Sequence, residues 1–137
     1  MTDVTSREAF RRAVEAHDLD GMMAPFAEDA VLHSPITFHP FEGRAAIRQL
    51  LGILIEVFQD FHYTDELDAA GGTKALVFRA RVENRDLEGI DLIRFDATGR
   101  IRDFTVFIRP RSAIERLLAE VAPRLAAVTG ALGHKAS

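Results

Sequence analysis

The chain has 137 residues, a length that usually forms one domain around a single hydrophobic core. Its net charge of −4 argues against nucleic acid as the main partner, because phosphate binding needs a positively charged surface. It contains no cysteine, which excludes disulfides, thiolate zinc sites and a cysteine nucleophile.

The first half of the chain has mostly helical patterns. Thr5 and Glu8 have the spacing of a capping box, and prolines end the two segments that follow. Between Gly43 and Phe58, apolar residues recur every three or four positions, as they do on the buried face of a helix. The elements that we expect are, in order, a helix from Thr5, a short helix within residues 18–26, a strand over 30–34, a loop over 36–43 and a helix over 43–58.

Alternating apolar and polar residues replace this pattern in the second half. In residues 74–84, Leu76, Phe78, Ala80 and Val82 fall on one face, which predicts a half-buried strand. The other face carries Arg79, Arg81 and Glu83. Ser112 and Glu115 predict the cap of a last helix, which Pro123 should kink or shorten. The expected elements are strands over 61–68, 74–84, 89–95 and 101–109, turns at Gly71-Gly72, 85–89 and Gly99, a closing helix, and a flexible tail over 129–137.

Helices that precede a run of strands predict an α+β fold rather than repeated β-α-β units. We expect a single domain over residues 1–128. The first residues are polar and partly acidic, unlike a signal peptide, and the longest apolar run, over residues 50–55, is too short to span a bilayer. The sequence therefore predicts a soluble, cytoplasmic protein that has neither a membrane nor nucleic acid as its partner.

Three segments resemble the nuclear transport factor 2-like superfamily, which includes ketosteroid isomerases and SnoaL-like polyketide cyclases. AHDLDGMMAPFAEDAVLHSP (16–35) and FEGRAAIRQLL (41–51) are similar to the opening of these proteins, and GIDLIRFDATGRIRDF (89–104) to their paired late strands. The resemblance covers residues 5–120. It implies a cone-shaped fold, in which a curved, mostly antiparallel sheet wraps around N-terminal helices and encloses an apolar pocket, with a C-terminal helix after it. The same fold hosts enzymes, binders and interaction modules.

The resemblance also assigns positions within a site. A ketosteroid isomerase uses a tyrosine on the first helix and a protonated aspartic acid on a late strand as donors to an oxyanion, and a second aspartate moves the proton. The late-strand acid falls on Asp91, but the tyrosine position falls on Phe10 and the base position on Ser34. Because neither of these two side chains can serve, the sequence argues against ketosteroid isomerase activity by that mechanism.

Asp91 allows two interpretations. If it faces a pocket, the position that we favour, burial among apolar side chains disfavours its charged form and leaves a hydrogen-bond donor or a general acid/base, which makes Asp91 a candidate catalytic residue. Alternatively, it is an ion-paired carboxylate. The arginines on neighbouring strands that can pair with it are Arg79, Arg81, Arg94 and Arg102.

His39 and Tyr63 are two further candidates for a catalytic role beside Asp91. His39 lies in a loop that the resemblance places near the pocket mouth, where an ordinary exposed histidine is the alternative. Tyr63 can donate into the pocket if its strand turns that way, but it can also lie at a sheet edge with a solvated hydroxyl. By strand alternation His33 should point away from the pocket. The histidine spacing fits no metal motif, and we predict neither a metal nor a cofactor.

The sequence thus predicts a SnoaL-like protein whose apolar pocket binds a small hydrophobic organic molecule. It either carries out cofactor-free proton-transfer chemistry of the isomerase, cyclase or hydrolase type with Asp91, or is a non-catalytic ligand-binding or protein-interaction module. The resemblance also implies a homodimer that pairs through the outer sheet face, where we expect an apolar stripe; cover of this face by the tail or the last helix is the alternative. The residues expected to line the pocket are Phe10, Val14, Phe26, Leu32, Ser34, Phe58, Phe78, Ile93, Phe104 and Val106.

Overall fold

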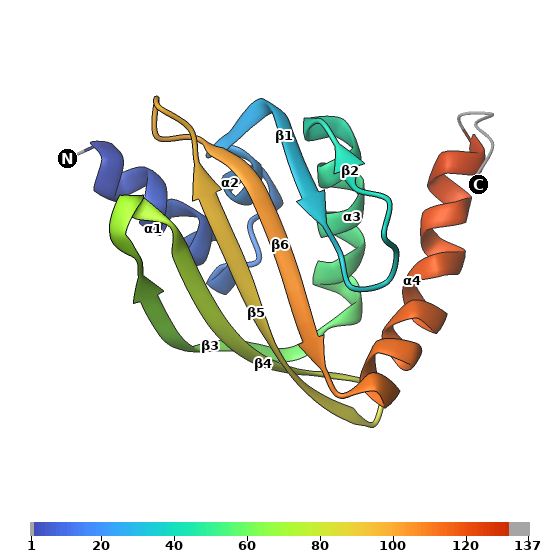
Figure 1. The fold of residues 1–137 in the computed structure, drawn as a ribbon. Coiled ribbons are helices and arrows are strands. Elements are labelled where there is room, and N and C mark those ends of the chain that lie inside the picture. The colour runs from blue at the N-terminus through green and yellow to red at the C-terminus, as the bar shows by residue number, and fades with distance from the viewer. Residues whose placement is uncertain (1, 132–137) are drawn as a thin grey trace.

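The structure is a computed structural model that describes the backbone of residues 2–131 and the side chains of residues 8–128. Four α-helices and six strands follow one another as an α+β fold (Figure 1). No helix within this part of the chain has both the length and the apolar character needed to cross a membrane. The elements are α1 (Thr2–Glu15), α2 (Leu19–Met23), β1 (Phe26–His33), β2 (Phe41–Glu42), α3 (Arg44–Val57), β3 (Gln59–Asp68), the 3₁₀ turn η1 (Ala70–Gly72), β4 (Lys74–Val82), β5 (Arg85–Phe95), β6 (Ile101–Arg109) and α4 (Arg111–Ala131).

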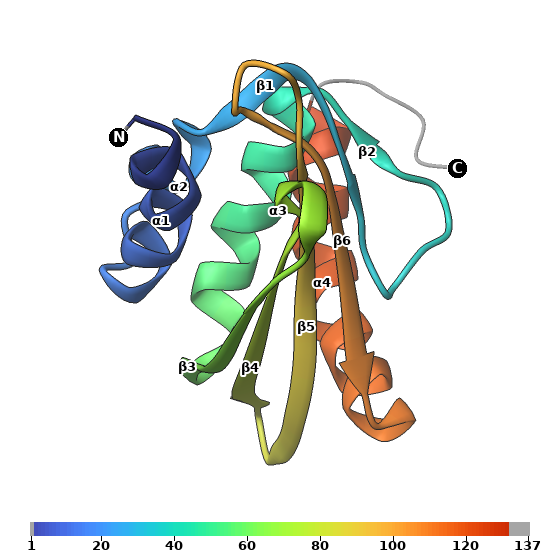
Figure 2. The same ribbon diagram turned by 60° about the vertical axis from the view of Figure 1, so that its left-hand side comes forward.

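The six strands form one curved sheet in the order β2-β1-β6-β5-β4-β3. Neighbouring strands are antiparallel except β1 and β6, which run parallel. The helices α1, α2 and α3 lie against the concave inner face, and α4 turns back from the end of β6 to lie beside α3 (Figures 1 and 2). The fold class predicted from the sequence is therefore confirmed.

Aromatic side chains join the first helix to the sheet. The ring of Phe10 on α1 lies 5.0 Å from that of Phe104 on β6 and 6.0 Å from that of Phe26 on β1, measured between ring centroids. All three are buried, and edge-on contacts at such distances are favourable for aromatic pairs. On the inner face of β4 the buried side chains alternate as the sequence predicts, at Leu76, Phe78, Ala80 and Val82.

Several boundaries in the sheet region differ from the predictions, including the start of β3 at Gln59 and the end of β4 at Val82. β1 begins at Phe26 rather than at residue 30, because Phe26 pairs with Ile101 of β6; an irregular register between Phe26 and Val31 hides this strand in the sequence. The predicted loop over 36–43 contains the two-residue strand β2. The turn between β4 and β5 lies at residues 83–84, not 85–89, because Arg85 already pairs with Val82.

The helix ends also differ from the predictions. α1 begins at Thr2, three residues before the predicted cap at Thr5. α4 begins at Arg111, and the carbonyl oxygen of Pro110 accepts the first hydrogen bonds, so Ser112 is inside the helix and does not cap it. The helix continues past Pro123 to Ala131, although proline removes one internal hydrogen bond. It therefore enters the segment expected to be a tail, and residues 132–137 lie outside the described part.

Candidate functional site: an apolar cavity with one acid pair

A cavity lies between the helices and the inner face of the sheet. The centre of a water molecule can move through about 80 Å³ of it, whereas a single bound water needs only about 10–15 Å³ measured in this way. Eight of the ten side chains expected from the sequence line this space: Phe10, Val14, Leu32, Ser34, Phe58, Phe78, Phe104 and Val106.

The other two expected residues do not reach the cavity. Phe26 is 0% exposed and Ile93 is 1% exposed, and both are packed into the core rather than into the cavity wall. Both were expected to line the pocket, but periodicity alone does not separate a wall residue from a core residue behind it.

Four polar side chains line the cavity among the described residues, and the rest of its lining is apolar. They are Asp91 on β5, Tyr63 on β3, His17 after the end of α1, and Ser34 after the end of β1. No lysine or arginine belongs to this lining within the part of the chain that the structure describes. Apart from His17, which is positive only when protonated, the described wall therefore offers hydrogen bonds but no positive charge.

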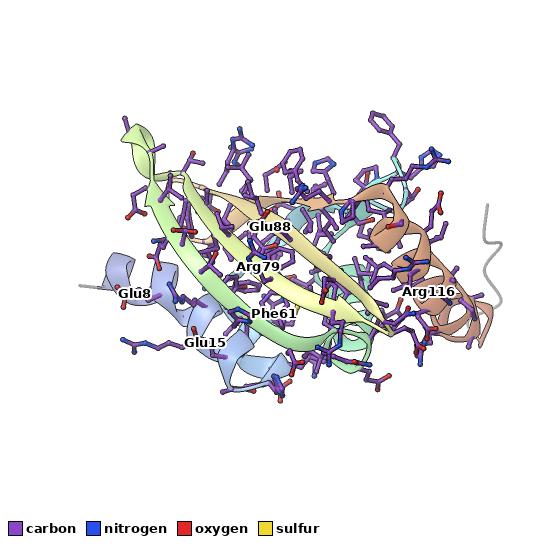
Figure 3. All side chains as sticks on the ribbon, turned by 90° about the horizontal axis from the view of Figure 1, so that it is seen from below. Glu8, Glu15, Phe61, Arg79, Glu88 and Arg116 are labelled. Atoms are coloured by element: carbon purple, nitrogen blue, oxygen red, sulfur yellow. The ribbon has the colours of Figure 1, made fainter. Side chains whose placement is uncertain are left out.

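Asp91 faces the cavity because it lies on the inner side of the central strand β5. It is opposite Leu76 of β4 and Val106 of β6, and its residue exposure is only 6%. No ion pair of Asp91 is found among the described side chains, so the alternative of an ion-paired carboxylate is wrong there. Arg79 instead pairs with Glu88 on the outer face, and Arg81 pairs with Asp60 (Figure 3 labels Arg79 and Glu88).

Tyr63 supplies the hydrogen bond that Asp91 receives. Its hydroxyl oxygen Oη lies 3.1 Å from Asp91 Oδ2 and donates to it. On β3 it pairs with Phe78 of β4, so its side chain reaches across one strand to arrive at β5. The ring contacts Phe61 edge-on, with 5.1 Å between centroids. Of the two positions that the sequence left open for this tyrosine, the buried one is observed.

The surroundings shift the proton affinities of both members of this pair. Burial raises the pKa of Asp91 to about 7, although the hydrogen bond from Tyr63 opposes the shift. Burial, followed by the nearby charge of Asp91, raises the pKa of Tyr63 well above its usual value. Tyr63 therefore remains a donor at physiological pH, while Asp91 is close to half protonated.

Gly89, two residues before Asp91, allows an aromatic ring to lie beside the acid. A Cβ atom placed on Gly89 would lie 2.3 Å from Phe78 Cζ and 2.6 Å from the carbonyl oxygen of Phe107. No side chain fits there unless both the ring of Phe78 and the backbone of β6 at Phe107 move. Since Phe78 is also part of the cavity wall, the glycine helps to set the shape of the space next to Asp91.

The two other histidines considered above lie outside the cavity. His39 is exposed on the loop before β2 and is not part of the lining, so the predicted pair of His39 with Asp91 is not formed. His33 points to the other side of β1, as strand alternation predicts, and its Nε2 lies 3.3 Å from Asp103 Oδ2 on β6.

The sequence analysis did not consider His17 as a site residue. It follows Phe10 by seven residues, a spacing that places both on one face of a helix, which was a usable signal. Its backbone has a φ of 56°, just after α1 ends, and its side chain belongs to the cavity lining. Such a conformation is uncommon outside glycine and has no clear mark in the sequence.

A family model described as "SnoaL-like domain" matches residues 7–104, which is more than half of the chain. The chain belongs to the SnoaL-like family. A steroid delta-isomerase from Pseudomonas aeruginosa is 36% identical to it, with 93% of this chain and 94% of that chain covered and a TM-score of 0.87.

Two further solved structures share the fold of this SnoaL-like chain. An uncharacterized protein with a cystatin-like fold from Silicibacter pomeroyi is 26% identical, covers 93% of this chain and 90% of its own, and has a TM-score of 0.86. A putative SnoaL-like polyketide cyclase from Shewanella denitrificans is 13% identical, covers 86% of this chain and 98% of its own, and has a TM-score of 0.66. The last likeness concerns the fold alone.

Both positions that depart from the ketosteroid isomerase pattern lie in the wall of this SnoaL-like cavity. Phe10 contributes an apolar ring where the resemblance implies a tyrosine. Ser34 takes the place of a carboxylate, and its Oγ accepts a hydrogen bond from the backbone N–H of Ile36 at 3.2 Å. The polar chemistry of the cavity is therefore concentrated on Asp91 and Tyr63, with His17 as the other ionisable group in the lining.

Proposed function

We propose that the cavity binds a small, neutral, apolar organic molecule through one oxygen atom that meets the Asp91–Tyr63 pair. The hydrogen bond between these two buried side chains, in an otherwise apolar wall, is the observation that carries this proposal. Apolar walls with a few placed polar groups are typical of small-molecule sites. An anionic ligand is disfavoured, because the described lining supplies a carboxyl group and no cationic side chain to match it.

The pair is suited to proton transfer without a cofactor. Near neutral pH Asp91 can give or take a proton, because its pKa lies at about 7. Tyr63 stays protonated and can donate to an oxygen that becomes negative during the reaction. Isomerisation, cyclisation and hydrolysis all need these two roles. The usual ketosteroid isomerase residues do not supply them here, since Phe10 and Ser34 stand at two of the three positions.

A non-catalytic binding module is the second candidate. A carrier or sensor needs only apolar walls and one polar anchor, and the absence of the two isomerase residues at positions 10 and 34 favours it. The two candidates share the ligand site and differ in whether a bond of the ligand changes.

Ligand binding can be tested with three compounds that share one ring system. 2-Naphthol carries a hydroxyl group, naphthalene carries none, and 2-naphthoate carries a negative charge. One good hydrogen bond is worth about 1 kcal/mol, so the protein should bind 2-naphthol about fivefold more tightly than naphthalene. The anion should bind least. Fluorescence titration of the full chain measures all three affinities.

The Asp91→Leu and Tyr63→Phe variants are the matched proteins for this test, because each removes one hydrogen-bonding group of the pair. Both should weaken the preference for 2-naphthol over naphthalene while still binding naphthalene, because the rest of the apolar wall is unchanged. Equal affinity of the unsubstituted protein for the two compounds, or tighter binding of the anion, would contradict the proposal.

Turnover separates the two candidate functions. The name of the Pseudomonas aeruginosa relative makes an unsaturated steroid ketone the first substrate to examine, since formation of a conjugated ketone changes its ultraviolet absorbance. We expect any turnover of such ketones to be lost in Asp91→Asn. Binding without turnover across a panel of ketones and epoxides supports the non-catalytic module instead.

We further propose that the protein forms a homodimer through the outer face of the sheet. Phe107 on β6 is 54% exposed and Ile90 on β5 is 38% exposed, and they are register partners on this face. Half-buried Leu92 and Val77 lie on the same side. Exposed apolar side chains gathered on one sheet face favour association with a second copy.

A further inference from the structure

Arg11 lies against the tyrosine of the acid pair but is not part of the cavity lining. Its guanidinium carbon Cζ is 5.4 Å from the centroid of the Tyr63 ring. Cations at this distance from an aromatic face are attracted to it. Tyr63 thus has Arg11 of α1 near its ring, the aromatic side chains of Phe61 and Phe78 beside it, and Asp91 at its hydroxyl.

Ion pairs hold Arg11 in this place. Its Nη1 is 2.7 Å from Glu66 Oε1 on β3, and its Nε is 3.1 Å from Glu15 Oε2 one turn further along α1. Glu66 in turn is paired with Lys74 on β4, whose side chain is 5% exposed and whose Nζ also lies 2.9 Å from Asp68. The hydrogen bond from Lys74, and after it that from Arg11, lowers the pKa of Glu66.

This chain of charges crosses the seam between α1 and the edge strand β3. The backbone of β3 is hydrogen-bonded to the sheet on one side only, through β4, and Tyr63 is its one buried residue. Figure 3 looks onto this seam from below, with Glu15 on α1 and Phe61 on β3 labelled. The Arg11–Glu66 contact is a side-chain link between the helix and the strand that carries Tyr63.

We propose that Arg11 is a positioning residue for the acid pair: it holds the Tyr63 ring so that the hydroxyl donates to Asp91. This inference rests on the proposed function, in which that pair meets the ligand. Arg11 acts through Tyr63, because it contacts the tyrosine ring, Glu15 and Glu66, and no contact of Arg11 with Asp91 is found among the described side chains. The charged groups that face Tyr63 or Arg11 are Glu15 from α1, Glu66 from β3 and Asp91 from β5, and Lys74 from β4 pairs with Glu66 behind them.

The experiment measures the pKa of Asp91 by carboxyl ¹³C NMR in the free, full-length protein. Loss of the Tyr63 hydrogen bond removes an interaction that favours the charged carboxylate, so Tyr63→Phe should raise the pKa of Asp91 by about one unit. Arg11→Gln should raise it in the same direction by about half a unit, because the ring is no longer held. Arg11→Lys keeps a cation over the ring and should return most of the original value.

Arg12→Gln is the matched control. Arg12 is the next residue of the same helix and forms a similar pair with Glu8 at 3.3 Å, but it is exposed. The Arg12→Gln substitution removes one positive charge, as Arg11→Gln does, and should leave the pKa of Asp91 unchanged.

The double variant Arg11→Gln/Tyr63→Phe separates positioning from a direct effect of charge. If Arg11 acts through the tyrosine, the double variant has the same Asp91 pKa as Tyr63→Phe alone. An equal shift from Arg11→Gln in both backgrounds overturns the inference, since the charge then acts on Asp91 directly.

Glu66→Gln supplies a second, independent variant. Removal of the negative charge of Glu66 would by itself lower the pKa of Asp91, whereas release of Arg11 should raise it. The sign of the change in this pKa therefore shows which of the two effects dominates. A fall overturns the inference. Likewise, a shift in Tyr63→Phe with none in Arg11→Gln overturns the role of Arg11 and leaves the acid pair intact. If Tyr63→Phe itself leaves the pKa of Asp91 unchanged, the Asp91–Tyr63 hydrogen bond is not supported, and neither is the role of Arg11.

Discussion

Asp91→Asn should make the protein more stable at high pH and leave its stability almost unchanged at low pH. Asparagine has the shape of aspartic acid and can still accept the hydrogen bond from Tyr63, but it cannot ionise. In the unfolded chain Asp91 loses its proton near its ordinary pKa of 3.8, whereas in the folded protein it keeps the proton up to about pH 7. Between these two values the folded state binds more protons, so the free energy of unfolding falls as the pH rises.

The size of this effect follows from the pKa difference. The shift from 3.8 to about 7 amounts to about three units, and each unit corresponds to about 1.4 kcal/mol. Asp91 should therefore reduce the free energy of unfolding by about 4 kcal/mol at alkaline pH relative to acid pH. That is a large fraction of the stability of a typical domain, about 5–15 kcal/mol.

Urea denaturation of both proteins, at a series of pH values between about 4.5 and 8, measures the difference directly. Other carboxyl groups also titrate in this range, but they are common to both proteins and cancel. The protein concentration is held constant because subunit association also shifts stability. A stability difference between the two proteins that is independent of pH refutes the reasoning, since Asp91 would then have the same pKa folded and unfolded.

Asp96→Ala is a control of opposite sign. Hydrogen bonds from Thr98, and after it from the backbone of Arg100, lower the pKa of Asp96 in the turn before β6. Its contribution to stability is present at neutral pH and is lost as the pH falls through the folded pKa. The advantage of the unsubstituted protein over Asp96→Ala should therefore shrink on acidification.

Three other changes have defined outcomes. Gly89→Ala should displace the ring of Phe78, since the new Cβ would lie 2.3 Å from it. We expect weaker naphthalene binding and a lower Tm, and unchanged binding would show that Gly89 does not set the shape of the cavity wall. His39→Ala should leave naphthol affinity unaltered because the residue lies outside the cavity, so a clear loss means that the loop closes over the ligand. Phe107→Glu should convert a dimer into a monomer in light scattering, whereas a protein that is already monomeric at micromolar concentration contradicts the proposed interface.

The inward position of Asp91 was predictable because strands have a period of two. With Ile93 on the same face and Ile90 and Leu92 on the other, only one orientation buries the apolar side chains of both neighbouring strands. A one-residue change of register would reverse every side chain. The α+β order and the helix over residues 44–57 were predictable for a similar reason, since their apolar periods are long and regular.

The partner of Asp91 was not predictable from such patterns. Tyr63 is 28 residues away, and its contact with Asp91 depends on the register of three strands. The register of β3 is irregular between Tyr63 and Asp65, so alternation does not fix which of its residues point inward. The position of His39 outside the cavity was not predictable either, because the path of a loop depends on contacts that leave no periodic trace.

The pKa of Asp91 in the free protein decides whether this carboxyl group lies in an apolar wall or in an ion pair. Carboxyl ¹³C NMR, with Asp91→Asn to assign the signal, gives the value without knowledge of the ligand. The account predicts a pKa of about 7. A value at or below that of free aspartic acid, about 3.9, contradicts it.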